Sequence, residues 1–180
     1  MEPNIIIRSI FDFPNCNITR HRNGTTTYSH KAIRTKVVAP KNHTVISLEP
    51  EFIVPQDGNV KQDCEHEAMK RWLKKHNADS RSLGVTVLGD DLYCLKPMCL
   101  AIRDAGFNFI LVCLPESHKT LYEWVDFLAA GGKKQSHINL GLPGKEYETD
   151  TYRFVNDVPI RDGEDALTVN WCEITTTNEE

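Results

Sequence analysis

The sequence predicts an α/β fold built around two short parallel strands that a helix connects. Val85 to Leu88 are four consecutive apolar or β-branched residues, a run that fits a strand buried on both faces. Pro97 to Ala105 is expected to be a helix, with proline in its first turn and Gly106 just past its end. Phe107 to Leu114 is a second short apolar run. This order of strand, helix and strand predicts a right-handed crossover and therefore a parallel pair.

Antiparallel strands and a helix are expected before this pair. Asn4 to Phe13 shows no sustained period and indicates at most one irregular strand. Thr25 to Val38 is rich in Thr, Tyr, Ile and Val, and Val45 to Val54 is a second strand candidate, interrupted at Pro50; we expect the two to pair antiparallel. Gln62 to His76 is the clearest helix, because apolar residues recur there every three or four positions. These residues are Cys64, Ala68, Met69, Trp72 and Leu73.

A smaller β-rich part is expected at the end of the chain. Thr120 to Glu123 matches a capping box that would begin a helix, with Ser117 as an alternative start. Lys133 to Asp150 has no helical period and contains Gly and Pro, so we expect a loop there. Tyr152 to Val155 and Leu167 to Thr176 are expected to be strands, the second with alternating apolar residues.

The composition excludes several classes of protein. The formal net charge of −4 and the pI near 6.0 argue against binding of nucleic acid by bulk electrostatics, so any such binding has to come from local clusters. No apolar run approaches the roughly 20 residues that span a bilayer, and the acidic start of the chain does not resemble a secretory signal. The six cysteines have no spacing typical of zinc modules. We expect a cytoplasmic protein without a membrane partner.

Asp90 is the first candidate site residue. It follows the predicted strand and Gly89 directly, and the carboxyl end of a strand is where open α/β sheets place their chemistry. Asp91 is the second choice. Asp is also favoured at helix caps and in turns, so a structural role is the alternative for both carboxylates.

Four cations on the predicted helix form a second candidate site. They lie close to its expected C-terminal end, where they would suit the helix dipole or simply be solvated. The alternative is contact with DNA phosphates. These residues are Lys70, Arg71, Lys74 and Lys75.

Several segments occur in the order and at the spacing of one protein family. They are Gln56 to Gly58, Lys61 to Glu65, Gly89 to Tyr93, Pro115 to Lys119, Leu121 to Glu123, Tyr152 to Asp157 and Val169 to Glu173. From about Tyr28 onward the chain resembles the DDE transposases of bacterial insertion sequences, in the branch that carries a β insertion inside an RNase H-like domain.

The resemblance implies a fold, an activity and a metal. It implies an RNase H-like mixed sheet flanked by helices, with residues 1–132 as part of the catalytic core and residues 133–180 as the β insertion. In that family three carboxylates hold two Mg²⁺ or Mn²⁺ ions, which promote cleavage and transfer of DNA strands during transposition, a form of DNA recombination. Asp90 matches the second of these carboxylates.

The sequence departs from the family at the other two carboxylates. It contains neither the Asp-Gly-Thr setting of the first acid nor the Tyr-x-x-Arg-x-x-x-Glu-x-x-x-x-x-Lys helix of the third. Asp12 lacks that setting, and Glu173 matches a strand of the insertion, so neither is proposed as one of the catalytic carboxylates. We therefore expect an internal piece of a transposase from a mobile element, lacking the first strand and the last helix. Since one carboxylate cannot hold two metal ions, we expect neither stable binding of the two ions nor activity from this chain alone.

Two other functions are kept open. A non-enzymatic relic could bind DNA, a second copy of itself or a full-length transposase. An unrelated α/β phosphohydrolase could use Asp90 as nucleophile or metal ligand, with His118 as its only convenient partner group.

Overall fold

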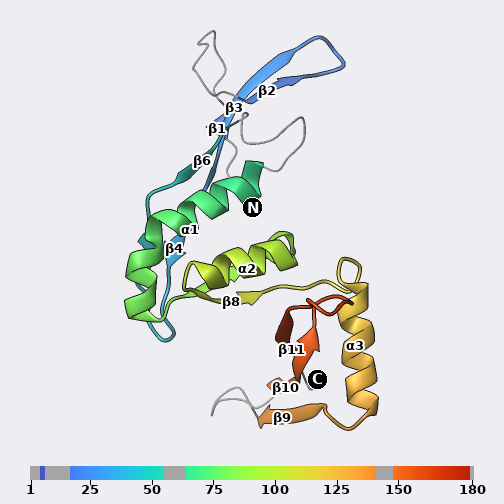
Figure 1. Cartoon of the computed structure of the whole chain (residues 1–180). Coiled ribbons are helices and arrows are strands. Elements are labelled where there is room, and N and C mark those ends of the chain that lie inside the picture. The colour runs from blue at the N-terminus through green and yellow to red at the C-terminus, as the bar shows by residue number, and fades with distance from the viewer. Residues whose placement is uncertain (1–4, 7–16, 55–63, 141–147, 179–180) are drawn as a thin grey trace. The chain divides into compact units, whose positions relative to one another are not determined.

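The chain folds as a mixed α/β protein in two compact units. The computed structural model describes residues 5–6, 17–54, 64–140 and 148–178 (Figure 1). Unit 1 is Met1–Leu111 and unit 2 is Val112–Glu180. The α/β class is confirmed, whereas the division into a core of residues 1–132 and an insertion of residues 133–180 depends on the family resemblance and stays a prediction.

Unit 1 begins with antiparallel strands centred on β3 (Thr26–Ile33). Strand β3 pairs with β1, β2 and β6, and the short strands β4 and β5 pair with each other. The expected antiparallel pairing of residues 25–38 with residues 45–54 is thereby confirmed, although each stretch is divided into two strands. The bounds are Ile5–Ile6 for β1, Asn17–Arg20 for β2, Lys36–Val37 for β4, Ile46–Ser47 for β5 and Glu51–Ile53 for β6.

Helix α1 (Cys64–Leu83) follows and packs its apolar stripe inward. Ala68, Met69, Trp72 and Leu73 are all buried, as the spacing predicts. The helix continues seven residues beyond the expected end at position 76. This last part is mostly polar, and its apolar residues Ala78 and Leu83 do not continue the stripe by themselves, so the hydrophobic pattern could not indicate it.

The strand, helix and strand that the sequence predicts are present in unit 1. Strand β7 (Thr86–Gly89), helix α2 (Lys96–Asp104) and strand β8 (Asn108–Leu111) follow one another, and β7 and β8 pair in parallel, with Leu88 opposite Ile110. Gly106 lies just after α2 at φ +90°, a conformation that favours glycine.

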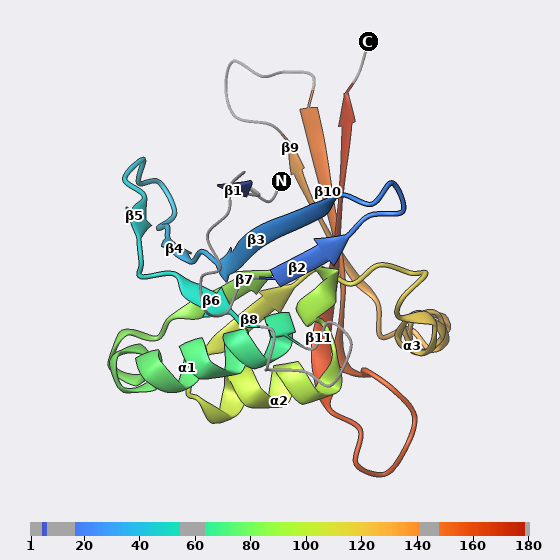
Figure 2. The same cartoon turned by 90° about the horizontal axis from the view of Figure 1, so that it is seen from above.

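The described residues cover only one face of the β7–β8 pair, and the expectation of a strand buried on both faces is wrong. Helices α1 and α2 lie on the same side of the pair (Figure 2), and Val87 and Phe109 pack against the core that these helices form. On the other face, Leu88 and Ile110 are 62% and 67% exposed. The expected single mixed sheet is also absent from the described residues, because β7 pairs only with β8 there.

Unit 2 packs helix α3 (Lys119–Ala130) against a three-stranded antiparallel sheet. Its strands are β9 (Gln135–Leu140), β10 (Glu148–Pro159) and β11 (Thr168–Asn178). The last two confirm and extend the predicted strands. Strand β9 contradicts the expected loop: residues 135–140 have no clear period of their own, and their pairing with β10 determines the conformation.

The start of α3 also differs from the expectation. His118 occupies the N-cap position and makes no side-chain capping hydrogen bond, so the capping box at Thr120 and the alternative start at Ser117 are both wrong. The helix is held instead by its buried side chains Leu121 and Val125 and by an edge-to-face contact between the rings of Tyr122 and Trp171.

Candidate functional site

Asp90 stands at the carboxyl end of β7, where the sequence places it. Its side chain is exposed, and its Oδ1 accepts a hydrogen bond of 3.2 Å from the backbone N–H of Leu92. Asp90 is thus the N-cap of a 3₁₀ helix, Asp91–Tyr93. The capping alternative is confirmed by this geometry. The catalytic role of Asp90 stays a prediction, since a cap can use one carboxylate oxygen and leave the other toward solvent.

The turn that follows Asp90 is fixed to the first turn of α1. The hydroxyl of Tyr93 donates to Glu65 Oε1 at 2.7 Å. His66 Nε2 lies 2.9 Å from the carbonyl oxygen of Leu92, to which it donates. These two contacts join a strand end to a helix more than 20 residues earlier, and they position the Asp90 turn on a rigid support. The sequence gives no local signal for either contact.

Gly89 is required by close packing rather than by an unusual backbone angle. A Cβ atom at this position would lie 2.9 Å from Leu111 Cδ2 and 3.3 Å from Tyr93 Cδ2. The strand end therefore passes directly beneath these two side chains. A glycine next to Asp90 lets the chain turn without displacing them.

The described residues do not fit a two-metal centre by themselves. Among them, no group of three or more His, Cys, Asp or Glu side chains could hold a metal ion. Mg²⁺ requires near-octahedral coordination by oxygen, usually with at least one or two carboxylates. Asp90 would supply one such ligand. Asp12 lies outside the described residues, and Glu173 forms an ion pair with Arg153 on the neighbouring strand.

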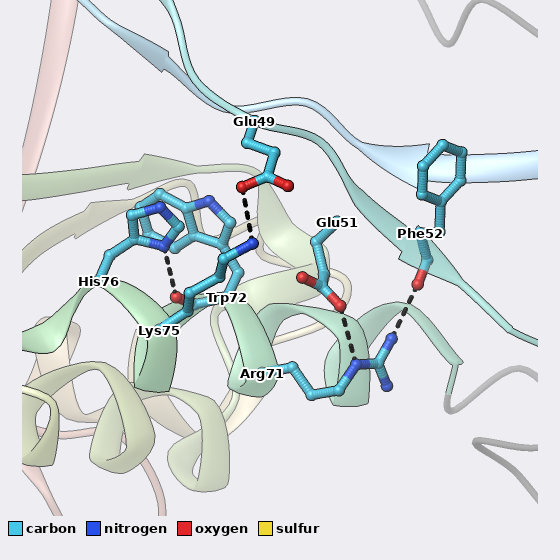
Figure 3. Close-up of polar contacts among 7 residues, drawn as sticks. All are labelled: Glu49, Glu51, Phe52, Arg71, Trp72, Lys75 and His76. Atoms are coloured by element: carbon cyan, nitrogen blue, oxygen red, sulfur yellow. Dashed lines mark hydrogen bonds and ion pairs between the residues drawn. The ribbon is translucent and has the colours of Figure 1, made fainter.

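The basic cluster on α1 is largely neutralised by carboxylates of unit 1. Arg71 Nε donates to Glu51 Oε1 at 2.9 Å, and Arg71 Nη2 donates to the carbonyl oxygen of Phe52 at 2.8 Å (Figure 3). Lys75 Nζ lies 2.7 Å from Glu49 Oε2. These bonds attach α1 to β6 and to the loop before it.

The two remaining cations of the cluster differ from each other. Lys70 forms an ion pair of 2.6 Å with Glu67, one turn earlier on the same helix. Lys74 is exposed, with no ion pair among the described residues. The suggested role of the cluster at a helix C-terminus is wrong, because α1 continues to Leu83 and places all four cations in its interior. Their DNA contact stays a prediction that this pairing does not favour.

The other sequence-predicted group, His118, belongs to unit 2, where it is buried at the start of α3. Asp90 belongs to unit 1. A joint role for these two side chains stays a prediction.

Comparison with known proteins gives no match to a family model, a curated protein or a solved structure. Among the described residues, no helix is both long enough and apolar enough to cross a membrane.

Proposed function

We propose that this chain is part of a DDE-type DNA transposase and that Asp90 is one of the carboxylates of its catalytic site. The observation that carries the proposal is the position of Asp90: an exposed carboxylate at the end of β7, beside the parallel strand β8, on a turn fixed to α1. This is the edge at which open α/β sheets bind their ligands.

The arrangement of the sheets supports the proposal. The resemblance implies a mixed sheet whose central strand carries the first acid, and the Asp-Gly-Thr sequence of that strand is absent here. A sheet without its central strand would separate into an antiparallel part and a parallel part. Unit 1 has this form, with strands around β3 on one hand and the β7–β8 pair on the other.

The uncovered face of β7 and β8 supports it in a second way. Parallel strands are usually covered on both faces, yet Leu88 and Ile110 are largely exposed. The family's last helix, which carries the third acid, is also absent from this sequence. A further helix on this face would complete the usual three-layer arrangement.

The DNA that flanks the reading frame tests the proposal first. We expect it to encode the Asp-Gly-Thr strand upstream and the Tyr/Arg/Glu/Lys helix downstream, between inverted repeats. If neither segment is encoded in any frame, the transposase assignment is wrong.

Strand transfer by the complete protein tests the role of Asp90. With Mg²⁺ or Mn²⁺ and a donor DNA, we expect Asp90→Asn to reduce strand transfer by at least about 100-fold, as expected for a group that acts directly in the chemistry. Asn is an equally good N-cap, so the fold should be retained. Asp91→Asn is the matched control and should remain active. Unchanged strand transfer in Asp90→Asn contradicts the assignment.

The chain of 180 residues provides its own test. We expect it neither to cut nor to join DNA, because one carboxylate of the trio is present. Metal-dependent strand transfer by this chain alone would contradict that expectation. Hydrolysis of small phosphoesters that Asp90→Ala abolishes would instead support the phosphohydrolase alternative.

A further inference from the structure

One stretch of unit 1 carries positive charge without any carboxylate. Residues 17–48 contain six Lys and Arg residues and no Asp or Glu. All six are exposed, and none forms an ion pair within the described part of the chain. This contrasts with the cluster on α1, where three of the four cations are paired. The six are Arg20, Arg22, Lys31, Arg34, Lys36 and Lys41.

The net charge of the whole chain does not reveal this basic stretch. Unit 1 has 15 Lys and Arg against 12 Asp and Glu, whereas unit 2 has 6 against 13. The net charges are therefore +3 and −7, which together give the −4 of the chain. Binding of a polyanion requires a local cluster in such a protein, and residues 17–48 contain one.

Strands β2 and β3 form a hairpin at the start of this stretch, and its tip is well defined. The backbone N–H of His21 donates to Thr25 O at 2.9 Å, and that of Gly24 donates to His21 O at 3.0 Å. Asn23 Oδ1 accepts from the backbone N–H of Thr25 at 3.1 Å and from its hydroxyl at 2.7 Å. Figure 1 shows the hairpin extending beyond α1 and α2. Arg20 is the last residue of β2, and Arg22 lies within the turn.

We propose that the β2–β3 hairpin, residues 17–33, binds duplex DNA, with its tip in the major groove and with Arg20 and Arg22 on the phosphates. The major groove of B-DNA is wide enough for a two-stranded β-ribbon. Arg donates hydrogen bonds to phosphate in a fixed fork. The ribbon is polar at its tip, so it lacks the apolar anchors of a membrane-binding segment. The deep, narrow major groove of A-form RNA does not admit side chains of this kind.

This inference deepens the proposed function, because it assigns the DNA contact to residues other than Asp90 and other than the cluster on α1. It makes a separate claim on binding alone. The two can therefore fail independently: loss of strand transfer in Asp90→Asn tests the site, and DNA affinity without metal tests the hairpin.

Fluorescence anisotropy with a labelled 20-base-pair duplex, in EDTA and across 50 to 200 mM salt, measures the contact. We expect the double variant Arg20→Ala/Arg22→Ala to lower the slope of log K against log salt by about 1.8, since each lost phosphate contact removes about 0.9. At 0.1 M salt this corresponds to binding weaker by about 60-fold. Each single variant should lose about 8-fold.

Two variants act as controls. Lys133→Ala/Lys134→Ala removes two exposed cations from unit 2 and should leave DNA binding unchanged. Arg20→Lys/Arg22→Lys keeps both charges and should retain the salt slope. Circular dichroism and the midpoint of thermal unfolding verify that each variant is folded; if the double variant unfolds, the two single variants decide.

Four results would overturn the proposal. They are absence of duplex binding by the parent chain, an unchanged slope in the hairpin variant, tighter binding of single-stranded DNA or duplex RNA than of duplex DNA, and loss of binding in Lys70→Ala/Lys74→Ala instead of in the hairpin variant. The last result would move the contact to α1.

Discussion

Unit 1 packs its parallel strand pair against two helices and unit 2 packs its sheet against one helix, but the second face of the strands differs between the units. In unit 1, Leu88 and Ile110 leave the second face of a parallel pair apolar and exposed. In unit 2, the second face of β11 presents Asn170, Cys172 and Thr176 together with the exposed Ile174. Antiparallel sheets commonly face water on one side, whereas parallel strands are usually covered on both. Within the described residues, unit 2 therefore follows the usual pattern of an antiparallel sheet, whereas the parallel pair of unit 1 keeps an apolar face exposed.

The two units also differ in net charge and in how their cations are paired. Unit 2 is strongly acidic and its described ion pairs are local, as between Arg161 and Asp165 or between neighbouring strands at Arg153 and Glu173. Unit 1 uses cations on α1 to attach the helix to β6, and it leaves those of the β2–β3 hairpin exposed. The presence or absence of an ion pair, rather than the net charge of a unit, thus distinguishes structural cations from those available to a ligand.

The largest expected effect is a difference in stability between two leucine variants of unit 1, one in the buried core and one on the exposed face of β7. Leu73 is 2% exposed on α1 and Leu88 is 62% exposed on β7. We expect Leu73→Ala to lower the free energy of unfolding by about 2–5 kcal/mol, because it leaves a cavity among tightly packed residues. Leu88→Ala, the same change on the open face, should cost less than about 0.5 kcal/mol. Urea unfolding measures both. A large loss for Leu88→Ala would mean that this face is covered in solution.

The next effect compares one arginine from each unit. Arg71 joins α1 to Glu51 and to the Phe52 carbonyl and is partly buried, so Arg71→Ala should cost about 1–2 kcal/mol of stability after allowance for its exposure. Arg161 pairs with Asp165 at the surface, and Arg161→Ala should cost at most about 0.5 kcal/mol. Equal losses in urea unfolding would contradict the structural role that we assign to Arg71.

A smaller effect compares one glycine from each unit. Gly89→Ala should cost about 1 kcal/mol, because its Cβ would meet the Leu111 and Tyr93 side chains. Gly131 has φ −77° and no contact closer than 3.5 Å, so Gly131→Ala should be nearly neutral. A double-mutant cycle with Leu111→Ala should show that the cost at position 89 falls when the Leu111 side chain is shortened. An unchanged cost would place the strain elsewhere.

The parts of the fold that the sequence predicts are those in which local and long-range preferences agree. Pro97 at the start of α2 and Gly106 after its end define that helix by their own chemistry, and the apolar runs on either side are strands. Strand β9 has no such signal, since its partner β10 determines it. The sequence also does not show how many faces of the β7–β8 pair are covered. An apolar run such as Val85 to Leu88 fits a strand with one buried face as well as a strand with two.

The candidate site follows the same division. The place of Asp90 at a strand end could be predicted, since it depends only on the neighbouring residues. The supports at Glu65 and His66 could not, because they lie more than 20 residues away and are brought close by packing. Glu49 and Glu51 likewise neutralise the cluster on α1 across a similar separation. The lack of carboxylates from residue 17 to residue 48 is also visible in the sequence, and this signal could have indicated the basic hairpin.

The smallest expected effect concerns the ion pair between Glu49 and Lys75, which lies exposed at the surface. The hydrogen bond from Lys75 lowers the pKa of Glu49 below its ordinary value of 4.5, and the hydrogen bond to Glu49 raises the pKa of Lys75 above 10.5. A lowered carboxyl pKa stabilises the folded chain above 4.5 and loses this contribution as the pH falls through the folded value. A raised lysine pKa contributes below 10.5 and is lost as the pH rises through the folded value. The pair should therefore stabilise unit 1 most at neutral pH, weakly and less so at high salt.

A carboxyl ¹³C titration should show the Glu49 pKa returning to its ordinary value in Lys75→Gln but not in Lys75→Arg. A Glu49 pKa that is the same in the parent chain and in both variants would mean that the pair does not form in solution, and would leave Lys75 available to DNA.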